Sequence, residues 1–235
     1  MDYVLQFNAV FQHSDLILTG LINSVILSAS AIVMGFILAI FCARIRTEGG
    51  KLSRGIVATY VELVRNTPFL AQLFLIAFGI PQFAAFCGLS FRFSPQSIAI
   101  LALSLNLGAF VTEIIRAGLE SIPRSQIEAA ESLALTPGQI FFRIKLPPAL
   151  LKVYPAMSSQ FILQMLGTSI VSVIAVQELT ATAGTIQAET FRAFETYIVT
   201  MVIYFCLAWL FRGCFSTLAR YFLRWRPRFK RPESL

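Results

Sequence analysis

Long apolar stretches without a charged side chain divide this chain into about five parts. Charge-free runs cover residues 16–43, 66–91, 93–112, 153–177 and 196–211. A helix needs about 20 predominantly apolar residues to cross the hydrocarbon core of a bilayer. The runs do not show the strict alternation of apolar and polar residues that marks the strands of a membrane β-barrel. The pattern therefore predicts an all-α polytopic membrane protein with about five transmembrane helices.

With their flanking residues, these runs predict spans at about 16–43, 57–80, 93–117, 149–177 and 196–220. A loop is expected near Gly79-Ile80-Pro81, because Gly and Pro interrupt regular structure. The transmembrane domain then covers residues 16–220, between an N-terminal segment of residues 1–15 and a basic tail of residues 221–235. The longest connection, residues 120–148, lies between the third and fourth spans.

Composition supports a membrane protein and excludes two other classes. Hydrophobic residues make up 57% of the 235 residues, charged residues only 13%, and the mean hydropathy is +0.74. Soluble domains contain about 45–50% apolar and about 25% charged residues. A soluble globular domain is therefore excluded, and so is a disordered chain, which combines low hydrophobicity with high charge.

The basic residues predict the orientation in the membrane. Seventeen of the 19 Lys and Arg residues fall in the loops and tail on one side of the predicted spans, and two fall on the other. Loops rich in Lys and Arg stay in the cytoplasm. The N-terminus is therefore expected outside and the C-terminus inside. These flanks also explain the net charge of +7 as anchoring to anionic headgroups of the bilayer rather than as binding of nucleic acid.

Residues for catalysis or for metal binding are not evident. His13 is the only histidine, and the four cysteines show no CxxC spacing, so no metal site is predicted. The sequence holds neither a nucleophile–base pair nor a phosphate-binding G-x-x-x-x-G-K-[ST] motif. We therefore predict no catalytic residue, no bound cofactor and no enzymatic activity in this chain.

The connection at residues 120–148 carries signals for two short helices. Ser125 and Glu128 have the spacing of a capping box, which predicts a first helix over 126–133. Thr136 and Gln139 form a second box, which predicts a helix over 137–145. Pro147-Pro148 is expected to end this helix and to open the fourth span. A simple connection needs only a few residues. The residues alone leave two interpretations open, an interfacial helix among lipid headgroups or a docking site for a cytoplasmic partner.

Four segments resemble a known family, in that family's order. Glu128-Ala129-Ala130, followed by Leu146-Pro147, resembles the EAA loop of ABC-importer permeases. The other three resemble the polar amino acid branch of this family with its MetI-like fold. They are residues 62–68 with Gln72, residues 112–118 with Pro123 and Gln126, and residues 168–179. The resemblance covers roughly residues 16–220.

The resemblance implies a function, a set of partners and a location. It implies a permease subunit of an ATP-driven importer for polar amino acids or their derivatives, in a bacterial inner membrane with a periplasmic N-terminus. An ATPase homodimer would bind ATP and Mg²⁺ and dock on the EAA loop. A second permease subunit, non-identical or identical, and a periplasmic solute-binding protein would complete the transporter. The implied coupling residues are Glu128, Ala129, Ala130, Ala134, Leu146 and Pro147.

The sequence departs from the family pattern at two places. Ala134 stands where the family usually has a glycine that ends the first short helix, so this turn is either strained or helical. Leu166-Gly167 stands where the family often has a Lys-Asp pair, so substrate contacts of relatives that keep this pair do not transfer.

Charged and polar residues in or near the spans are candidates for gating and for the substrate pathway. Glu62/Arg65 and Glu113/Arg116 are spaced i,i+3, and form either surface ion pairs or, with Thr67 and Pro68, a gate or subunit interface. Polar residues near the centres of spans are Gln72, Asn106, Gln164, Thr168 and Ser169. They contact substrate or bond between helices, and we expect Thr168 and Ser169 to bond their own helix.

The pathway residues are all neutral, which bears on partners and on rival functions. A charged amino acid would need its counter-charge from another subunit, which favours a non-identical second permease. A secondary transporter or channel for a small polar solute is the main rival, but it would require repeats or ion ligands within the membrane. A scaffold subunit would explain the spans but not the two capped helices of residues 120–148.

Overall fold

The computed structural model describes residues 5–89 and 93–223, and all regular structure in this part is helical. The elements are α1 (Asn8–Phe11), α2 (Ser14–Glu48), α3 (Lys51–Arg65), α4 (Phe69–Phe74), the π-helical η1 (Leu75–Gly79), α5 (Ile80–Phe86), α6 (Pro95–Glu120), α7 (Arg124–Ser132), α8 (Pro137–Gln139), the π-helical η2 (Ile140–Lys145), α9 (Leu146–Gly167), the 3₁₀-helical η3 (Thr168–Ile174), α10 (Leu179–Thr190) and α11 (Ala193–Leu223). Residues 224–235, which make up most of the predicted basic tail, and the cation Arg92 lie outside the described residues.

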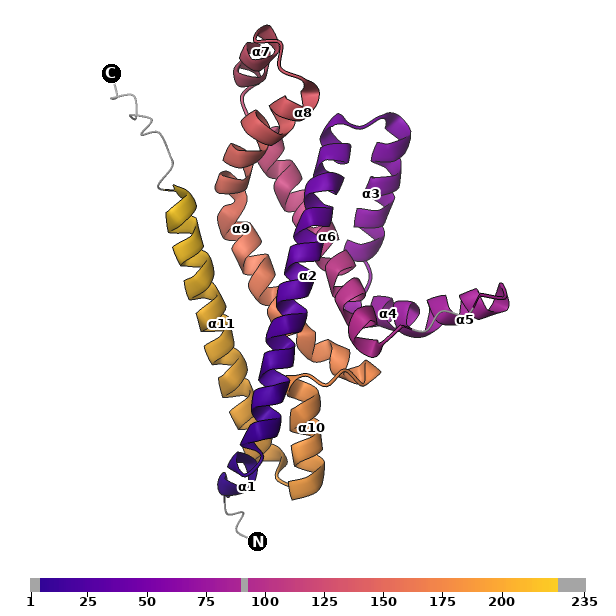
Figure 1. The fold of residues 1–235 in the computed structure, drawn as a ribbon, viewed down its shortest axis with the longest axis vertical. Helices are drawn as coiled ribbons and strands as arrows, with labels where there is room; N and C mark the ends of the chain where they lie inside the picture. The colour runs from indigo at the N-terminus through magenta and orange to yellow at the C-terminus, as the bar shows by residue number, and fades with distance from the viewer. Residues whose placement is uncertain (1–4, 90–92, 224–235) are drawn as a thin grey trace.

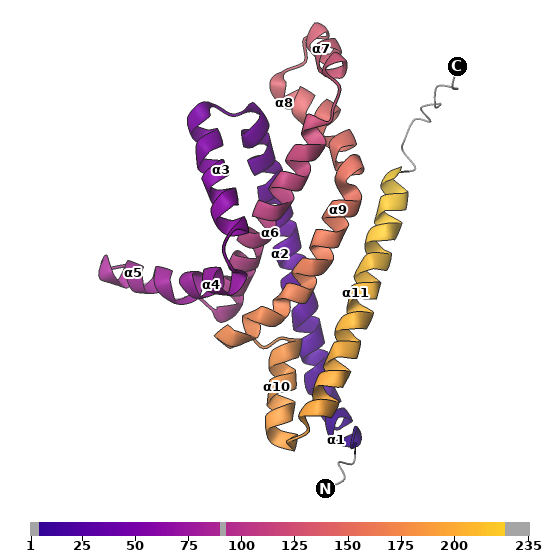
Figure 2. The same ribbon diagram turned by 180° about the vertical axis from the view of Figure 1, so that it is seen from behind.

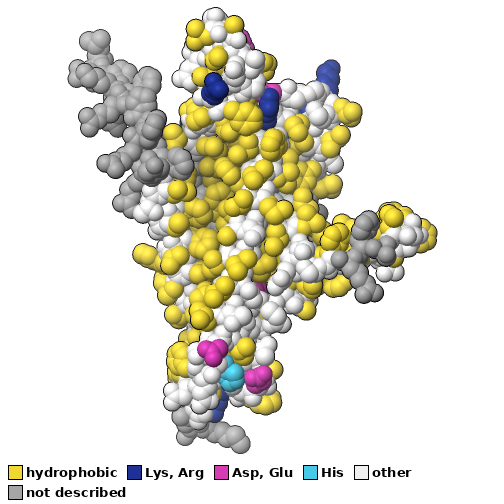
Figure 3. Space-filling model, viewed as in Figure 1, with side chains coloured by type: hydrophobic (Ala, Val, Ile, Leu, Met, Phe, Trp, Pro, Cys, Tyr) yellow, Lys and Arg dark blue, Asp and Glu magenta, His cyan; other side chains and the backbone are white. Residues whose placement is uncertain are grey.

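Five stretches of helix are long and apolar enough to cross a membrane, which confirms the predicted number. They are Ser14–Glu48, Phe69–Phe86, Pro95–Glu120, Pro137–Ile174 and Ala193–Leu218. The bundle is elongated, with α7 at one end and α1 and α10 at the other (Figures 1 and 2). Its middle is covered by apolar side chains, while Lys and Arg side chains stand at the α7 end (Figure 3). A membrane-spanning chain needs this distribution.

The centre of the bundle is the pair formed by α2 and α6, with α9 packed against both. Their buried residues include Ala39, Leu107, Val111, Ile115 and Phe161. The helices approach closely at Gly35, where a Cβ would lie 2.9 Å from the carbonyl oxygen of Ser104. Small residues at such contacts are the usual way in which membrane helices pack tightly.

Replacement of Gly35 by alanine is therefore expected to destabilise the bundle by about 1–3 kcal/mol, the usual cost of overpacking. The matched control is Gly184→Ala in α10, where a Cβ meets no atom within 4 Å. That change is expected to be neutral or stabilising, since alanine favours a helix. Thermal unfolding of both variants in detergent measures the difference, and equal unfolding temperatures would contradict the close packing of α2 and α6.

The second span differs from the prediction at both ends. Residues 57–80 do not form one helix, because the chain breaks at Asn66-Thr67-Pro68 between α3 and α4. Proline disfavours helical conformation in the residue before it, which explains the position of the break. The α3 helix folds back along α2 at the α7 end, and α4, η1 and α5 project sideways from the bundle (Figure 1).

The expected loop at Gly79-Ile80-Pro81 is wrong. The chain stays helical from Phe69 to Phe86 through the π-helical turn η1. Pro81 stands in the first turn of α5, directly after the π-helical turn η1.

The region after the fourth span also differs from the prediction. The helix becomes 3₁₀-helical at Thr168 and ends at Ile174 rather than at residue 177, with Ala175 in a left-handed conformation (φ 61°). Residues 179–190, expected to be a loop, form α10, whose N-cap Glu178 accepts a hydrogen bond from the Ala181 amide. An acidic N-cap is a known helix start signal, but the polar sequence of α10 lacks the apolar periodicity on which the prediction depended.

Candidate functional site

The helix α7 is the part of the described chain that extends furthest from the bundle at its end (Figures 1 and 2). Its residue Ala130 is buried and holds the helix against the rest of the loop. Glu128 and Ala129 are exposed on the outer side, and Leu133, at the end of the helix, is 75% exposed. A carboxylate, a methyl group and a large apolar side chain are therefore exposed on this helix, and the carboxylate has no partner among the described residues.

The predicted capping box at Ser125 is wrong. The helix begins at Arg124, directly after Pro123, whose backbone is extended (φ −60°, ψ 136°), and no side chain caps it. Because Ser125 already lies inside the first turn, its hydroxyl is not in the N-cap position. Glu128 therefore has no capping role, and its carboxylate makes no hydrogen bond or ion pair within the described residues.

Ala134 adopts the left-handed conformation, with φ at 54°. The backbone N–H of Leu135 donates to the carbonyl oxygen of Ala130 (3.3 Å), and the backbone N–H of Ala134 donates to the carbonyl oxygen of Glu131 (2.9 Å). These two bonds form a complete Schellman motif. Of the two alternatives for this turn, the structure therefore shows the strained one, in which a non-glycine residue closes the helix.

Replacing Ala134 with glycine is expected to stabilise α7 by about 1 kcal/mol, because glycine adopts the left-handed conformation without strain. Hydrogen exchange of the α7 amides should slow by roughly fivefold, because a stabilisation of about 1 kcal/mol lowers the population of the locally unfolded helix by that factor. Ala129→Gly in the middle of the same helix is the matched control and is expected to speed exchange. Faster exchange in the Ala134→Gly variant would contradict the strained turn.

The second capping box is confirmed. Thr136 Oγ1 accepts from the Gln139 amide, and the Gln139 side chain accepts from the Thr136 amide at 2.8 Å. Pro147-Pro148 opens the fourth span as expected, because both prolines stand at the start of α9, but it does not interrupt the helix, since the chain continues from α8 through η2 into α9. The two prolines occupy the first turn of α9, after the π-helical η2, where missing N–H groups are tolerated. Leu146 is buried and Pro147 is exposed.

Ion pairs and aromatic contacts join this loop to the end of α2, in what we call the clamp (Arg44, Glu48, Phe141, Phe142 and Lys145). Lys145 Nζ lies 2.7 Å from Glu48 Oε1, and Arg44 Nε lies 3.5 Å from Glu48 Oε2. The Arg44 guanidinium also lies 5.3 Å and 5.4 Å from the ring centroids of Phe141 and Phe142. Phe141 is fully buried. These contacts hold residues 141–145 of the loop against the end of α2.

The two predicted i,i+3 pairs behave differently. Arg116 binds Glu113 at 2.8 Å and Glu120 at 2.5 Å, and Arg46 reaches Glu113 from α2 at 3.4 Å. Glu62 and Arg65 are both exposed and are not paired with each other. Arg65, the last residue of α3, instead lies over the ring of Phe110 in α6, 5.7 Å from its centroid.

A cavity of about 320 Å³ lies between α4, α6 and α9, and it collects three of the predicted residues. Its lining residues are Thr67, Phe69, Leu103, Asn106, Phe110, Gln160, Leu163, Gln164, Gly167 and Ile170. Gln164 is buried and donates to the Leu103 carbonyl at 2.9 Å. Gln160 was not predicted, although it stands four residues before Gln164 and therefore shares its helix face.

Gln72, Thr168 and Ser169 make hydrogen bonds within the protein. The Gln72 amide nitrogen donates to the Val64 carbonyl and to Thr67, which caps the end of α3, while its oxygen accepts from Asn106 at 3.1 Å. Thr168 and Ser169 donate to carbonyls of their own helix. None of these three residues lines the cavity. The expected intrahelical bonding of Thr168 and Ser169 is confirmed, and Pro68 serves as the extended N-cap of α4.

Glu178 is a buried carboxylate in the segment 168–179 that resembles the family, and no role was predicted for it. It is fully buried and accepts hydrogen bonds from Tyr204 (2.7 Å) and Ser24 (3.4 Å), besides the Ala181 amide. Burial raises the pKa of Glu178, because these bonds offset only part of the lost hydration. The residue ties α10 to α2 and α11.

Five apolar spans, an amide-lined cavity between three of them and a helical projection at one end are features of a multi-pass membrane transport protein. The described residues contain no group of three or more His, Cys, Asp or Glu that could hold a metal ion. Residues 31–226 match the family described as "Binding-protein-dependent transport system inner membrane component", and the chain belongs to this family. It is therefore a permease subunit of the ABC-importer class.

Named relatives and a solved structure agree with this class. The nopaline transport system permease protein NocM of Agrobacterium fabrum is 34% identical, over 80% of each chain. The L-cystine transport system permease protein TcyL of Bacillus subtilis is 31% identical, over 79% of this chain and 78% of its own. The crystal structure of an amino acid ABC transporter with histidines has a TM-score of 0.80 and 32% identity, covering 93% of this chain and all of that one.

Proposed function

We propose that this permease imports amino acids or amino-acid derivatives into the cytoplasm, driven by ATP hydrolysis in a partner ATPase dimer. The observation that carries the proposal is the form of α7, a short projecting helix that ends in the turn at Ala134 and exposes Glu128 and Ala129. A carboxylate beside a small residue suits insertion into a cleft that presents a basic side chain. The partner would bind ATP and Mg²⁺, and this chain would bind no cofactor.

The distribution of charge supports an orientation with α7 in the cytoplasm of a bacterium and the N-terminus in the periplasm. Among the described residues the Lys and Arg side chains gather toward the α7 end, except for Arg192, which lies at the opposite end with His13, Glu189 and Glu195. Cytoplasmic flanks are enriched in Lys and Arg. The α10 end would then face a periplasmic solute-binding protein, and the membrane would be the bacterial inner membrane.

The cavity supports a polar substrate. Asn106, Gln160 and Gln164 offer amide groups, and Arg65 lies over Phe110, which lines the same cavity. Amides can hydrogen-bond both the carboxylate and the ammonium group of an amino acid. The relatives named for cystine and nopaline, and the solved amino acid transporter, point to the same class. A second permease subunit, which we propose to be non-identical, would close the cavity and supply further charge.

Uptake by membrane vesicles that contain the complete transporter tests the energy source. We expect uptake of labelled amino acids to require ATP hydrolysis and to persist when a protonophore removes the proton gradient. Uptake that needs the gradient but not ATP would instead support a secondary transporter. In the same assay Gln160→Ala is expected to raise KM, whereas Ser169→Ala, which lies outside the cavity, is not.

A further inference from the structure

The cavity between α4, α6 and α9 is lined by amide groups and by no charged side chain. Asn106 donates one N–H to the Gln72 side chain at 3.1 Å, and Gln164 donates one to the Leu103 carbonyl at 2.9 Å. These bonds fix how both amides point, and their carbonyl oxygens accept no hydrogen bond within the described residues. Such oxygens are acceptors that suit an ammonium group. The lining residues offer no charge to balance a carboxylate.

The guanidinium of Arg65 stands beside this cavity. It lies 5.7 Å from the ring centroid of Phe110, which lines the cavity, and Thr67, two residues after Arg65, lines it as well. Phe110 stands ten residues before Glu120, where α6 ends, which is about 15 Å along a helix. Arg65 is therefore a cation at the depth of a membrane span rather than at its end.

Within the part of the chain that the structure describes, Arg65 has no ion-pair partner. Glu62, one turn earlier on α3, is exposed and does not pair with it. The carboxylate of Glu113 on α6 is already shared by Arg116 at 2.8 Å and Arg46 at 3.4 Å. Contact with an aromatic ring offsets only part of the cost of a charge in a span. The position of Arg65 therefore suits an anion that is not part of these residues.

One face of α6 leads from the amides to this cation. Asn106, Phe110 and Glu113 are four and three residues apart, so they share that face. One turn, about 6 Å, separates Asn106 from Phe110, and a zwitterion that is hydrogen-bonded at both ends spans this distance. With its ammonium group at the amide oxygens, an amino acid in the cavity would direct its carboxylate toward Arg65 and the α7 end.

We propose that Arg65 binds the carboxylate of the transported solute at the α7 end of the cavity, while the carbonyl oxygens of Asn106 and Gln164 accept from its ammonium group. Arginine presents its N–H donors in a planar fork that matches a carboxylate. The inference rests on the proposed function and narrows it, because a transported solute then needs a free carboxylate. The non-identical second permease would supply charge for the remainder of the solute.

Binding of labelled solutes by the purified complex of permeases and ATPase, without the solute-binding protein, tests this role. The probes are L-cystine, L-glutamine, L-arginine and nopaline, each compared with its form in which carboxamides replace the carboxylates. Arg65→Gln is expected to weaken binding of the carboxylate form about tenfold or more, the ratio that a hydrogen bond to a charged group contributes. The weaker binding of the carboxamide form should not change. Arg65→Lys should retain part of the affinity, because lysine keeps the charge without the fork.

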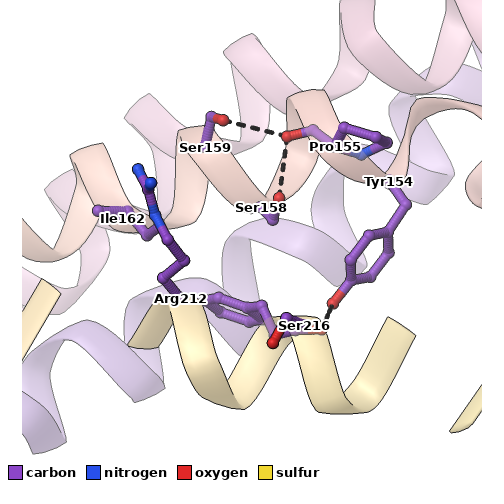
Figure 4. Close-up of a pocket in the computed structure, with 8 residues that line it drawn as sticks. Tyr154, Pro155, Ser158, Ser159, Ile162, Arg212 and Ser216 are labelled. Atoms are coloured by element: carbon purple, nitrogen blue, oxygen red, sulfur yellow. Dashed lines mark hydrogen bonds between the residues drawn. The ribbon is translucent and has the colours of Figure 1, made fainter. Parts of the chain in front are cut away.

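Arg212→Gln makes the same substitution at an arginine outside the cavity and is the matched control. Arg212 is exposed on α11 and lines a separate crevice of about 560 Å³ between α9 and α11 (Figure 4). This crevice shares no residue with the cavity, and its Tyr154, Ser158 and Ser159 hydroxyls already donate to backbone carbonyls. The affinity for each probe should therefore stay the same in this variant.

Failure of this inference is distinguishable from failure of the proposed function. Equal affinity of Arg65→Gln and of the unmodified complex for a bound probe would overturn the inference and leave the proposed function intact. An equal loss of binding for the carboxylate and carboxamide forms would also overturn it, since Arg65 would then maintain the fold or a subunit interface. Binding of none of the four probes would contradict the import of amino acids, and the inference with it.

Discussion

Replacing Glu128 with lysine is expected to abolish ATP-driven uptake and the stimulation of the partner ATPase, while the permease still inserts into the membrane. The carboxylate is exposed, and it neither caps a helix nor forms an ion pair within the described residues. The substitution should therefore remove a contact with another protein and leave the fold of this chain unchanged. Loss of one partner of an interfacial charge pair costs about 2–5 kcal/mol, which lowers docking affinity by roughly 30-fold or more. Uptake, ATPase rate and co-purification of the ATPase are the measurements.

Ser125→Ala is the matched control on the same helix. Its hydroxyl is exposed and lies inside the first turn rather than at the N-cap, so uptake should be unchanged. Normal coupled uptake in Glu128→Lys would contradict the docking role of α7. A loss of uptake in Ser125→Ala would show that the capping box predicted from the sequence forms after all.

Reversal of charge at Lys145 is expected to uncouple ATP hydrolysis from transport. The side chains of Lys145 and Glu48 are only 14% and 25% exposed, and the pair holds the loop to α2. Exposed pairs contribute about 0.2–1 kcal/mol, so replacing attraction by repulsion at this less exposed site should cost about 2 kcal/mol or more. With the clamp weakened, movement of α7 would no longer reach α2. Lys145→Glu should therefore lower the solute transported per ATP hydrolysed, with ATPase activity retained.

Arg143→Glu provides the matched control for this prediction. It makes the same change of charge two residues away, on an exposed side chain that forms no ion pair within the described residues. Lys145→Arg should preserve coupling. An unchanged ratio of uptake to hydrolysis in Lys145→Glu, measured in proteoliposomes, would show that the clamp does not transmit movement.

The sequence was sufficient for the features that depend on apolar content and on local hydrogen bonding. Five spans follow from the length of the charge-free runs, and the Thr136 box follows from residues three positions apart. The predicted helix boundaries were wrong where a proline or a carboxylate determines the conformation of the adjacent backbone. Pro68 breaks the second span, Pro123 displaces the start of α7, and Glu178 starts a helix that has no apolar stripe.

The candidate sites were predictable only in part, because a side chain's depth in the membrane does not fix the direction in which it points. Gln164 and Asn106 do line the cavity, whereas Gln72 is engaged in closing the break beside Pro68. The clamp joins residues about 100 positions apart, such as Glu48 and Lys145, and no local spacing relates them. Arg212 was counted among the cytoplasmic cations, and only the structure shows that it faces a crevice.

Site-directed photo-cross-linking from position 129 tests the central claim most directly. A photoreactive residue would replace the exposed Ala129, and Thr185, exposed on α10 at the opposite end, would be the control position. We predict that position 129 cross-links to a nucleotide-hydrolysing subunit in the complete transporter and that position 185 does not. Cross-links from position 129 to lipid alone would contradict the account, because α7 would then lie among the headgroups instead of docking on an ATPase.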